Sequence, residues 1–267
     1  MIINKLFHWT QEDAYKTLVE TRERQGFSVV NYLYGANLTA RKLFAKKKSD
    51  KSVRYHKALR EWDLLLPDGI GLQLFALLYY RRYHKKKVWL PNLNGTDFLP
   101  YCLERLDKEY DLKLVLYGTK PEGIELSAKF LKKKGYDVVY WQDGFREFDR
   151  NEFIKCRDRI SSVHNKKQIW VMIQGRTTVR DPIQELWVLD NMEKIIKSGL
   201  VVFNQSGTFD HNVLGGKEQR APRIVQTLKL ERLWRTLINP KKWRKKLAAT
   251  FWLAPLVLQK ILLKKGC

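Results

Sequence analysis

The chain has 267 residues, which fits one α/β domain with a full core and a short appendage and argues against two equal domains. Its formal net charge of +23, from 51 Lys and Arg against 28 Asp and Glu, points to a polyanionic partner: nucleic acid, a phosphorylated substrate or an anionic membrane. The three cysteines have no CxxC spacing, so neither a disulfide framework nor a zinc module is indicated.

The N-terminus, residues 1–17, lacks the charged start, apolar core and cleavage site of a secretory signal, and we expect a mature protein in a reducing cytoplasm. Short apolar runs then alternate with longer helical patterns, which predicts βαβ units and a mostly parallel sheet. The expected strands are residues 27–34, 62–66, 112–118, 137–141, 168–175 and 200–204. Residues 119–135 have Pro and Glu early, lysines late and a final glycine, which predicts a helix.

The segment LLLPDGIGLQLF, residues 64–75, puts one carboxylate, Asp68, between an apolar run and two glycines. Asp68 can cap the next helix, because its side-chain oxygens accept orphan amide hydrogens while Gly69 and Gly71 permit a tight turn. Alternatively, Asp68 ends a strand at the carboxyl edge of an α/β sheet, where open sheets place ligands and chemistry. The segment itself leaves both interpretations open.

Polar or glycine-rich segments follow most of the expected strands, and together they suggest a ligand-binding rim with helix N-termini facing a phosphate. They are residues 34–38, 67–71, 93–97, 117–123, 142–145, 174–185 and 204–210. The charge run 46–52 is expected to be an exposed loop. The chain has no GxxxxGK[ST], GxSxG, HExxH or Asp-x-Asp motif, and its histidines lack ligand spacing, so we expect no metal and no cofactor.

After residue 216 the character of the chain changes. Residues 217–267 hold 14 Lys or Arg and two acids, a net of +12, which is over half of the excess charge. The spacing of apolar residues over 229–238 predicts a basic amphipathic helix. Residues 247–263 are apolar for too short a run to provide the roughly 20 residues of a spanning helix. We therefore predict two parts, an α/β domain over 1–216 and a basic, membrane-associating appendage over 217–267; a tail helix docked on the core is the alternative.

An ordered series of segments resembles the WecG/TagA/CpsF family, glycosyltransferase family 26, over about residues 28–246. The segments are LLLPDGIGLQLF, NLNGTDFLPYCLERL, LVLYGTKPEGIELSAKFLKKKGYDVV, PIQELWVLDN, SGTFDHNVLGG and QRAPRIVQTLKLERLWRTLINPKKWRKK. The resemblance implies a Rossmann-like fold of the GT-E type and a metal-independent inverting transferase, peripheral at the cytoplasmic face of the bacterial inner membrane. The implied reaction moves a hexose-type sugar from a UDP-sugar to an undecaprenyl-diphosphate-linked sugar in cell-surface polysaccharide synthesis.

The same resemblance implies site residues. Asp68, in the family's DGxG motif, is the expected catalytic base. The expected substrate-binding residues are Asn37, Gly69, Gly71, Gly95, Asp97, Gly118, Gln184 and Glu185, and the expected lipid-diphosphate-binding residues are Arg220, Arg235 and Arg244.

This sequence departs from the family pattern in two segments. Gly35 stands where the family has Thr after the first strand, and Asn31 is an alternative to Asn37 for the asparagine of that motif. The segment before PIQE is longer than usual and adds Arg176 and Arg180, each of which can meet a phosphate or face water.

The expected partners are a UDP-sugar donor, a lipid-diphosphate-linked acceptor and an anionic membrane surface, with a homo-oligomer left open. Two functions from other classes remain as alternatives. A non-catalytic membrane scaffold of the same fold would explain the missing Thr. Nucleic-acid binding is the weaker alternative, because the aromatic residues fall mostly in core patterns and no binding signature occurs. The identity of the sugar does not follow from the sequence.

Overall fold

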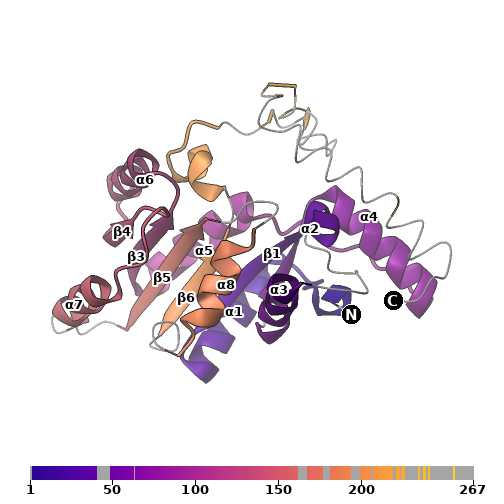
Figure 1. Ribbon diagram of the computed structural model, residues 1–267, viewed down its shortest axis with the longest axis horizontal. Coiled ribbons are helices and arrows are strands. Elements are labelled where there is room, and N and C mark those ends of the chain that lie inside the picture. The colour runs from indigo at the N-terminus through magenta and orange to yellow at the C-terminus, as the bar shows by residue number, and fades with distance from the viewer. Residues whose placement is uncertain are drawn as a thin grey trace.

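The computed structural model describes residues 2–40, 49–62, 64–161, 167–176, 181–193, 199–205 and 207–218, with isolated positions beyond. Its centre is a six-stranded sheet, parallel throughout, with the strand order β2-β1-β6-β5-β3-β4 (Figure 1). The strands are β1 Ser28–Tyr34, β2 Leu64–Asp68, β3 Asp111–Gly118, β4 Asp137–Gln142, β5 Gln168–Gly175 and β6 Leu200–Asn204. The α/β class and the six expected strands are confirmed. They were predictable because strands buried on both faces form continuous apolar runs.

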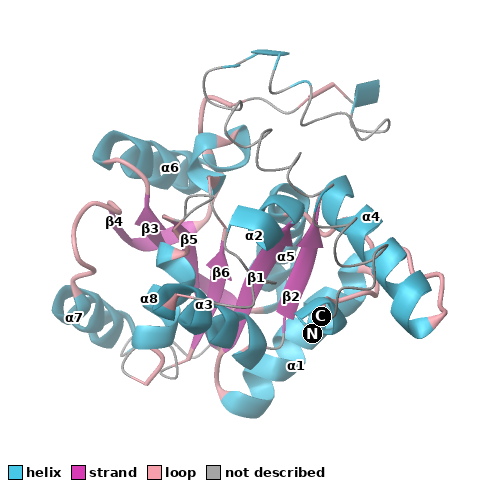
Figure 2. Cartoon of the chain, turned by 45° about the vertical axis from the view of Figure 1, so that its right-hand side comes forward, coloured by secondary structure: helices cyan, strands magenta, loops and turns pink. Residues whose placement is uncertain are grey.

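Helices cover both faces of this sheet (Figure 2). One face packs against α1 (Gln11–Gln25), α5 (Gly95–Glu109) and α6 (Pro121–Lys133). The other packs against α3 (Asp50–Glu61), α7 (Arg150–Ser161) and α8 (Ile183–Asp190). The helix expected between the third and fourth strands is thereby confirmed as α6.

Two further helices leave the carboxyl ends of β1 and β2. They are α2 (Gly35–Ala40) and α4 (Ile70–Tyr79), and α4 continues as the π-helical turn η2 (Tyr80–His84). Short 3₁₀ turns precede α1 and follow β6: η1 (Ile2–Lys5), η4 (Thr208–Asp210) and η5 (Asn212–Leu214).

The expectation of a loop over residues 46–52 is wrong for its described part. Ser49 is the N-cap of α3 and its hydroxyl oxygen accepts a hydrogen bond from the Ser52 amide at 3.3 Å. Asp50 lies in the first turn, where a carboxylate is favoured by the helix dipole. The charges therefore belong to a helix start.

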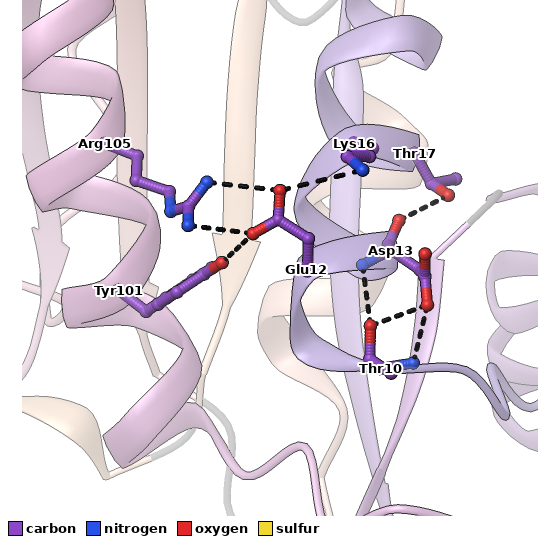
Figure 3. Close-up of polar contacts among 7 residues, drawn as sticks. All are labelled: Thr10, Glu12, Asp13, Lys16, Thr17, Tyr101 and Arg105. Atoms are coloured by element: carbon purple, nitrogen blue, oxygen red, sulfur yellow. Dashed lines mark hydrogen bonds and ion pairs between the residues drawn. The ribbon is translucent and has the colours of Figure 1, made fainter.

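Polar contacts hold α1 against α5, whose first residue lies at the candidate site described below. Glu12 of α1 accepts a hydrogen bond from the Tyr101 hydroxyl, and Arg105 Nη2 lies 2.8 Å from Glu12 Oε2 (Figure 3). Thr10 and Asp13 form a reciprocal capping box at the start of α1. The hydrogen bond from Tyr101 is the main cause that lowers the pKa of Glu12, so this carboxylate stays ionised beside Arg105.

The predicted appendage lies almost wholly outside the described residues, including the helix expected over 229–238 and the segment 247–263. The boundary after residue 216 therefore stays a prediction. Among the described helices, none combines the length and the apolar character needed to cross a bilayer.

Candidate active site

Asp68 is the last residue of β2, at the carboxyl edge of the sheet, in register with Tyr34 of β1. The N-cap of α4 is Gly69, which has no side chain to cap the helix. The φ angle of Gly69 is 84°, which favours glycine. Gly69, and not Asp68, therefore occupies the N-cap position of α4.

A returning segment of chain holds the turn that follows Asp68. The side-chain oxygen of Asn92 accepts a hydrogen bond from the Gly69 amide at 2.8 Å, and the Leu93 amide donates to the Pro67 carbonyl at 3.0 Å. The turn thus has its own supports. The sequence did not indicate Asn92, because the two partners are 23 residues apart.

The carboxylate of Asp68 lies near a buried tyrosine of β1. Burial raises the pKa of Tyr32 well above its usual value, and the negative charge of Asp68 adds to this shift. The Tyr32 hydroxyl has no hydrogen-bond partner among the described residues. Asp68 is therefore close enough to this buried hydroxyl to act on it electrostatically.

Gly95, the first residue of α5, touches Gln205, which directly follows β6. A Cβ on Gly95 would lie 2.1 Å from Nε2 and 2.8 Å from Cγ of Gln205. Gln205 is only 4% exposed, and its backbone N–H donates to the backbone carbonyl of Gln174 at 2.9 Å. This close approach is a packing reason for glycine at position 95, beside the substrate role that the family motif implies.

Asp97 lies two residues further along α5 and takes part in capping. Its amide donates to Asn94 Oδ1 at 3.0 Å, and Asn94 Nδ2 donates to the Asp97 carboxylate at 2.7 Å. The described contacts of Asp97 thus stabilise the start of α5, and its contact with substrate stays a prediction.

A row of buried carboxamides crosses the sheet below its edge. Asn31 of β1, Asn204 of β6 and Gln174 of β5 are neighbours in register and therefore share one face. Asn204 Nδ2 donates to Asn31 Oδ1 at 2.9 Å. Asn31 Nδ2, Asn204 Oδ1 and Gln174 Oε1 have no partner among the described residues, and neither does the side-chain nitrogen of the buried Asn37 in α2. Such amides need water or a ligand to be satisfied.

Gln184 and Glu185 begin α8, and both are almost fully buried. Gln184 Oε1 accepts a hydrogen bond from the amide of Arg176, which follows β5, at 3.1 Å. The Arg176 guanidinium lies 4.5 Å from the centroid of the Tyr117 ring. Its Nε has no partner in the described part of the chain. Arg180 lies outside the described residues.

The chain leaves β3 and β5, which are neighbours, in opposite directions: β3 leads through α6 to β4, and β5 leads through α8 to β6. Gly118 and Gly175 face each other in register at this point. A Cβ on Gly118 would lie 2.9 Å from the backbone of Gly175, so the two strand ends are in direct backbone contact. Open α/β sheets bind ligands at such a divergence.

The described site residues lie on one edge of the sheet, at strand ends or in the first turns of the following helices (Figure 1). They are Asn37, Asp68, Gly69, Gly71, Gly95, Asp97, Gly118, Gln184 and Glu185. Arg220, Arg235 and Arg244 lie outside the described residues. Within the described ranges no group of three His, Cys, Asp or Glu is placed to hold a metal ion.

Sequence reasoning did not single out Asn92. Gln174, Asn204 and Gln205 fall within the polar segments 174–185 and 204–210 that were expected at the rim, but none of the three was named as a site residue.

Comparison with known proteins identifies a family and a relative. Residues 6–266 match the model of the glycosyl transferase WecG/TagA/CpsF family. A relative from Bacillus spizizenii, an N-acetylglucosaminyldiphosphoundecaprenol N-acetyl-beta-D-mannosaminyltransferase, is 24% identical over 197 residues, which cover 73% of this chain and 68% of the relative.

Proposed function

Because the chain belongs to the WecG/TagA/CpsF family of glycosyl transferases, we propose that it moves a sugar from a UDP-sugar to an undecaprenyl-diphosphate-linked sugar, with Asp68 as the catalytic base. The acceptor class is supported by the relative, which is named for transfer to N-acetylglucosaminyldiphosphoundecaprenol. The UDP donor and a hexose-type sugar are the narrower part of the proposal.

The observation that supports this role is the position of Asp68 at the carboxyl end of β2, one residue before the N-cap of α4. In a one-step inverting transfer the acceptor hydroxyl oxygen attacks the anomeric carbon, and the bond from that carbon to the phosphate oxygen breaks. The hydroxyl proton passes to a carboxylate oxygen of Asp68, and UDP leaves. Gly69 and Gly71 add no side-chain bulk beside the carboxylate, which leaves room for a sugar.

We propose that the donor lies along the sheet edge, with its nucleotide over the divergence of β3 and β5 and its sugar toward β2. Neighbouring strands are about 4.8 Å apart, so β2 and β5, three spacings apart, are separated by about 14 Å. An extended nucleotide sugar can bridge such a distance. Arg176, at the end of β5, is then suited to accompany the diphosphate.

A lipid-linked acceptor is anchored in a bilayer, so the enzyme has to reach it at the membrane surface. We propose peripheral association at the cytoplasmic face. The appendage over 217–267 would contribute attraction to anionic lipid, and Arg220, Arg235 and Arg244 would bind the lipid diphosphate.

The test is transfer from a panel of UDP-sugars to a short-chain lipid-diphosphate monosaccharide, comparing the wild type with Asp68→Asn. The panel contains glucose, galactose, N-acetylmannosamine and its uronic acid. Loss of a general base should lower kcat about 100- to 10,000-fold, with melting temperature and UDP binding unchanged. Asp107→Asn, at an exposed position near the carboxyl end of α5, is the matched control and should keep turnover. Near-wild-type turnover of folded Asp68→Asn would end the assignment, and no transfer by the wild type from any donor would end the donor class.

A further inference from the structure

We call the chain between the two supports of the Asp68 turn, residues 70–93, the α4 arm. It consists of α4, η2 and a returning segment without regular secondary structure. Leu72, Phe75 and Ala76 of α4 are buried in one hydrophobic cluster with residues of β1 and β2. Gln73 Nε2 donates to the Leu90 carbonyl at 2.6 Å and so ties the outgoing helix to the returning segment. In Figure 2, α4 lies next to β2, on the outer side of this edge strand.

The tip of the arm is strongly cationic. Residues 81–87, RRYHKKK, hold five Lys or Arg, and no Asp or Glu occurs anywhere in residues 69–96. Lys85, Lys86 and Lys87 are exposed, and none of the five cations forms an ion pair within the described part of the chain. Some other cations of the described surface do form ion pairs, as Lys108 does with Glu104 at 2.7 Å. The arm therefore presents uncompensated positive charge.

The tip has a defined shape. The rings of Tyr79 and Tyr83 lie 5.0 Å apart, and the His84 ring lies 5.6 Å from that of Tyr79. Lys85 ends the π-helical turn with a φ angle of 57°, a conformation that a residue with a Cβ adopts at a cost and glycine adopts freely. Position 85 therefore carries a positive charge although glycine would fit its backbone conformation better.

Exposed apolar side chains accompany the cations. Leu74 on α4 is 47% exposed, Tyr83 in the tip 39%, and Trp89 in the returning segment 46%. Apolar and aromatic side chains next to Lys and Arg are the composition of surfaces that lie in the headgroup region of a bilayer.

We infer that the α4 arm docks on anionic phospholipid headgroups, as a contact separate from the C-terminal appendage. The inference rests on the proposed function for the presence of a membrane, and on the unpaired charge of the arm for its partner. Both ends of the arm hydrogen-bond at the Asp68 turn, through Gly69 and Pro67. Its 15 helical residues span about 22 Å. Docking would therefore fix Asp68 at a set distance from the lipid-linked acceptor.

The experiment measures partition of the full chain into vesicles of phosphatidylglycerol mixed with phosphatidylcholine, with pure phosphatidylcholine as reference. Each cation near an anionic surface contributes about 1 kcal/mol, which is about fivefold in partition. Neutralising three lysines, K85Q/K86Q/K87Q, should weaken partition about 100-fold. The matched control K129Q/K132Q/K133Q on α6 removes the same charge from another helix and should leave partition close to that of the wild type.

Lys85→Gly separates charge from folding. Because glycine suits the backbone at this position, the variant should melt at or above the wild-type temperature while its partition falls about fivefold. Equal losses in the arm and α6 triple variants, or no loss in the arm variant, would overturn the inference. So would an arm variant that abolishes self-association of the wild type without affecting vesicle binding, because the arm would then bind a second copy.

A transfer assay with a water-soluble acceptor keeps this inference apart from the proposed function. The arm variants should keep wild-type turnover there, because no arm lysine belongs to the site. Absence of turnover in the wild type would count against the proposed function and leave the vesicle result standing.

Discussion

The substitution Gly95→Ala tests the packing of the first turn of α5 against Gln205. The new methyl carbon would lie 2.1 Å from Nε2 and 2.3 Å from Cδ of Gln205, far inside van der Waals contact, so the buried glutamine side chain must move. Overpacking of this kind costs about 1–3 kcal/mol. The helix propensity of alanine returns at most about 1 kcal/mol, and we expect a net loss of roughly 1 kcal/mol in the free energy of unfolding.

Urea denaturation of a double-mutant cycle with Gln205→Ala measures this contact. Once Gln205 is truncated the methyl group has space, so Gly95→Ala should cost nothing or be stabilising in that background, with a coupling of about 1–3 kcal/mol. An equal loss in both backgrounds would refute the packing explanation. A variant of wild-type stability that no longer shifts its melting temperature with UDP would instead locate Gly95 at the substrate.

Two further predictions concern buried polar groups. Asn204→Leu should lower the free energy of unfolding, measured in urea, by about 1–3 kcal/mol because it leaves Asn31 unpaired. The double variant Asn31→Leu/Asn204→Leu should recover most of this loss. No recovery would mean that other groups satisfy the carboxamide row. Burial alone would raise the pKa of Asp143, but hydrogen bonds from Arg146 at 2.7 Å and from the Phe145 amide at 3.0 Å outweigh it and hold the pKa below its ordinary value. The stabilisation is then full above about pH 4 and is lost as the pH falls further, so Asp143→Asn should flatten the fall in melting temperature below about pH 4, and an unchanged acid limb would contradict the assignment.

The sheet could be predicted because its cause is local. The central strands are buried on both faces, and the apolar run itself marks the strand, as residues 168–175 and 200–204 show in β5 and β6. The start of α3 was not predicted, because the run of charged residues was interpreted as a loop. Ser49, within that run, is the N-cap of the helix. The strand order is a property of the assembled sheet, and it decides which loops meet.

The candidate site was predictable in outline only. The local pattern around Asp68 allowed a cap or a base, and it did not show that Gly69 takes the N-cap position or that Asn92, distant in sequence, accepts a hydrogen bond from the Gly69 amide. The contact of Gly95 with Gln205 joins residues that are further apart still. The carboxamide row exists because register aligns Asn31 with Asn204. Such contacts depend on tertiary structure, and a single sequence does not reveal them.

In the proposed reaction, negative charge develops on the diphosphate of the leaving UDP and has to be neutralised. The chain has no Asp-x-Asp motif. Asp68 is committed to the acceptor proton in our proposal, so we predict that cations of the protein take the place of a metal ion. Arg176, which follows β5, is the first candidate for neutralising the diphosphate. The candidates in the appendage are Arg220, Arg235 and Arg244.

Transfer should therefore survive EDTA, and Arg176→Ala should lower kcat about 100- to 1,000-fold. Arg176→Lys should restore only part of the rate, because a point charge lacks the forked hydrogen bonds that match a phosphate. Arg60→Ala at the end of α3 removes an equal charge away from this edge and should leave kcat unchanged. Suppose instead that EDTA abolishes transfer, Mg²⁺ restores it, and Arg176→Ala is as active as the wild type. The diphosphate would then be neutralised by a metal ion, and one of the carboxylates assigned here to packing or to proton transfer would have to hold it.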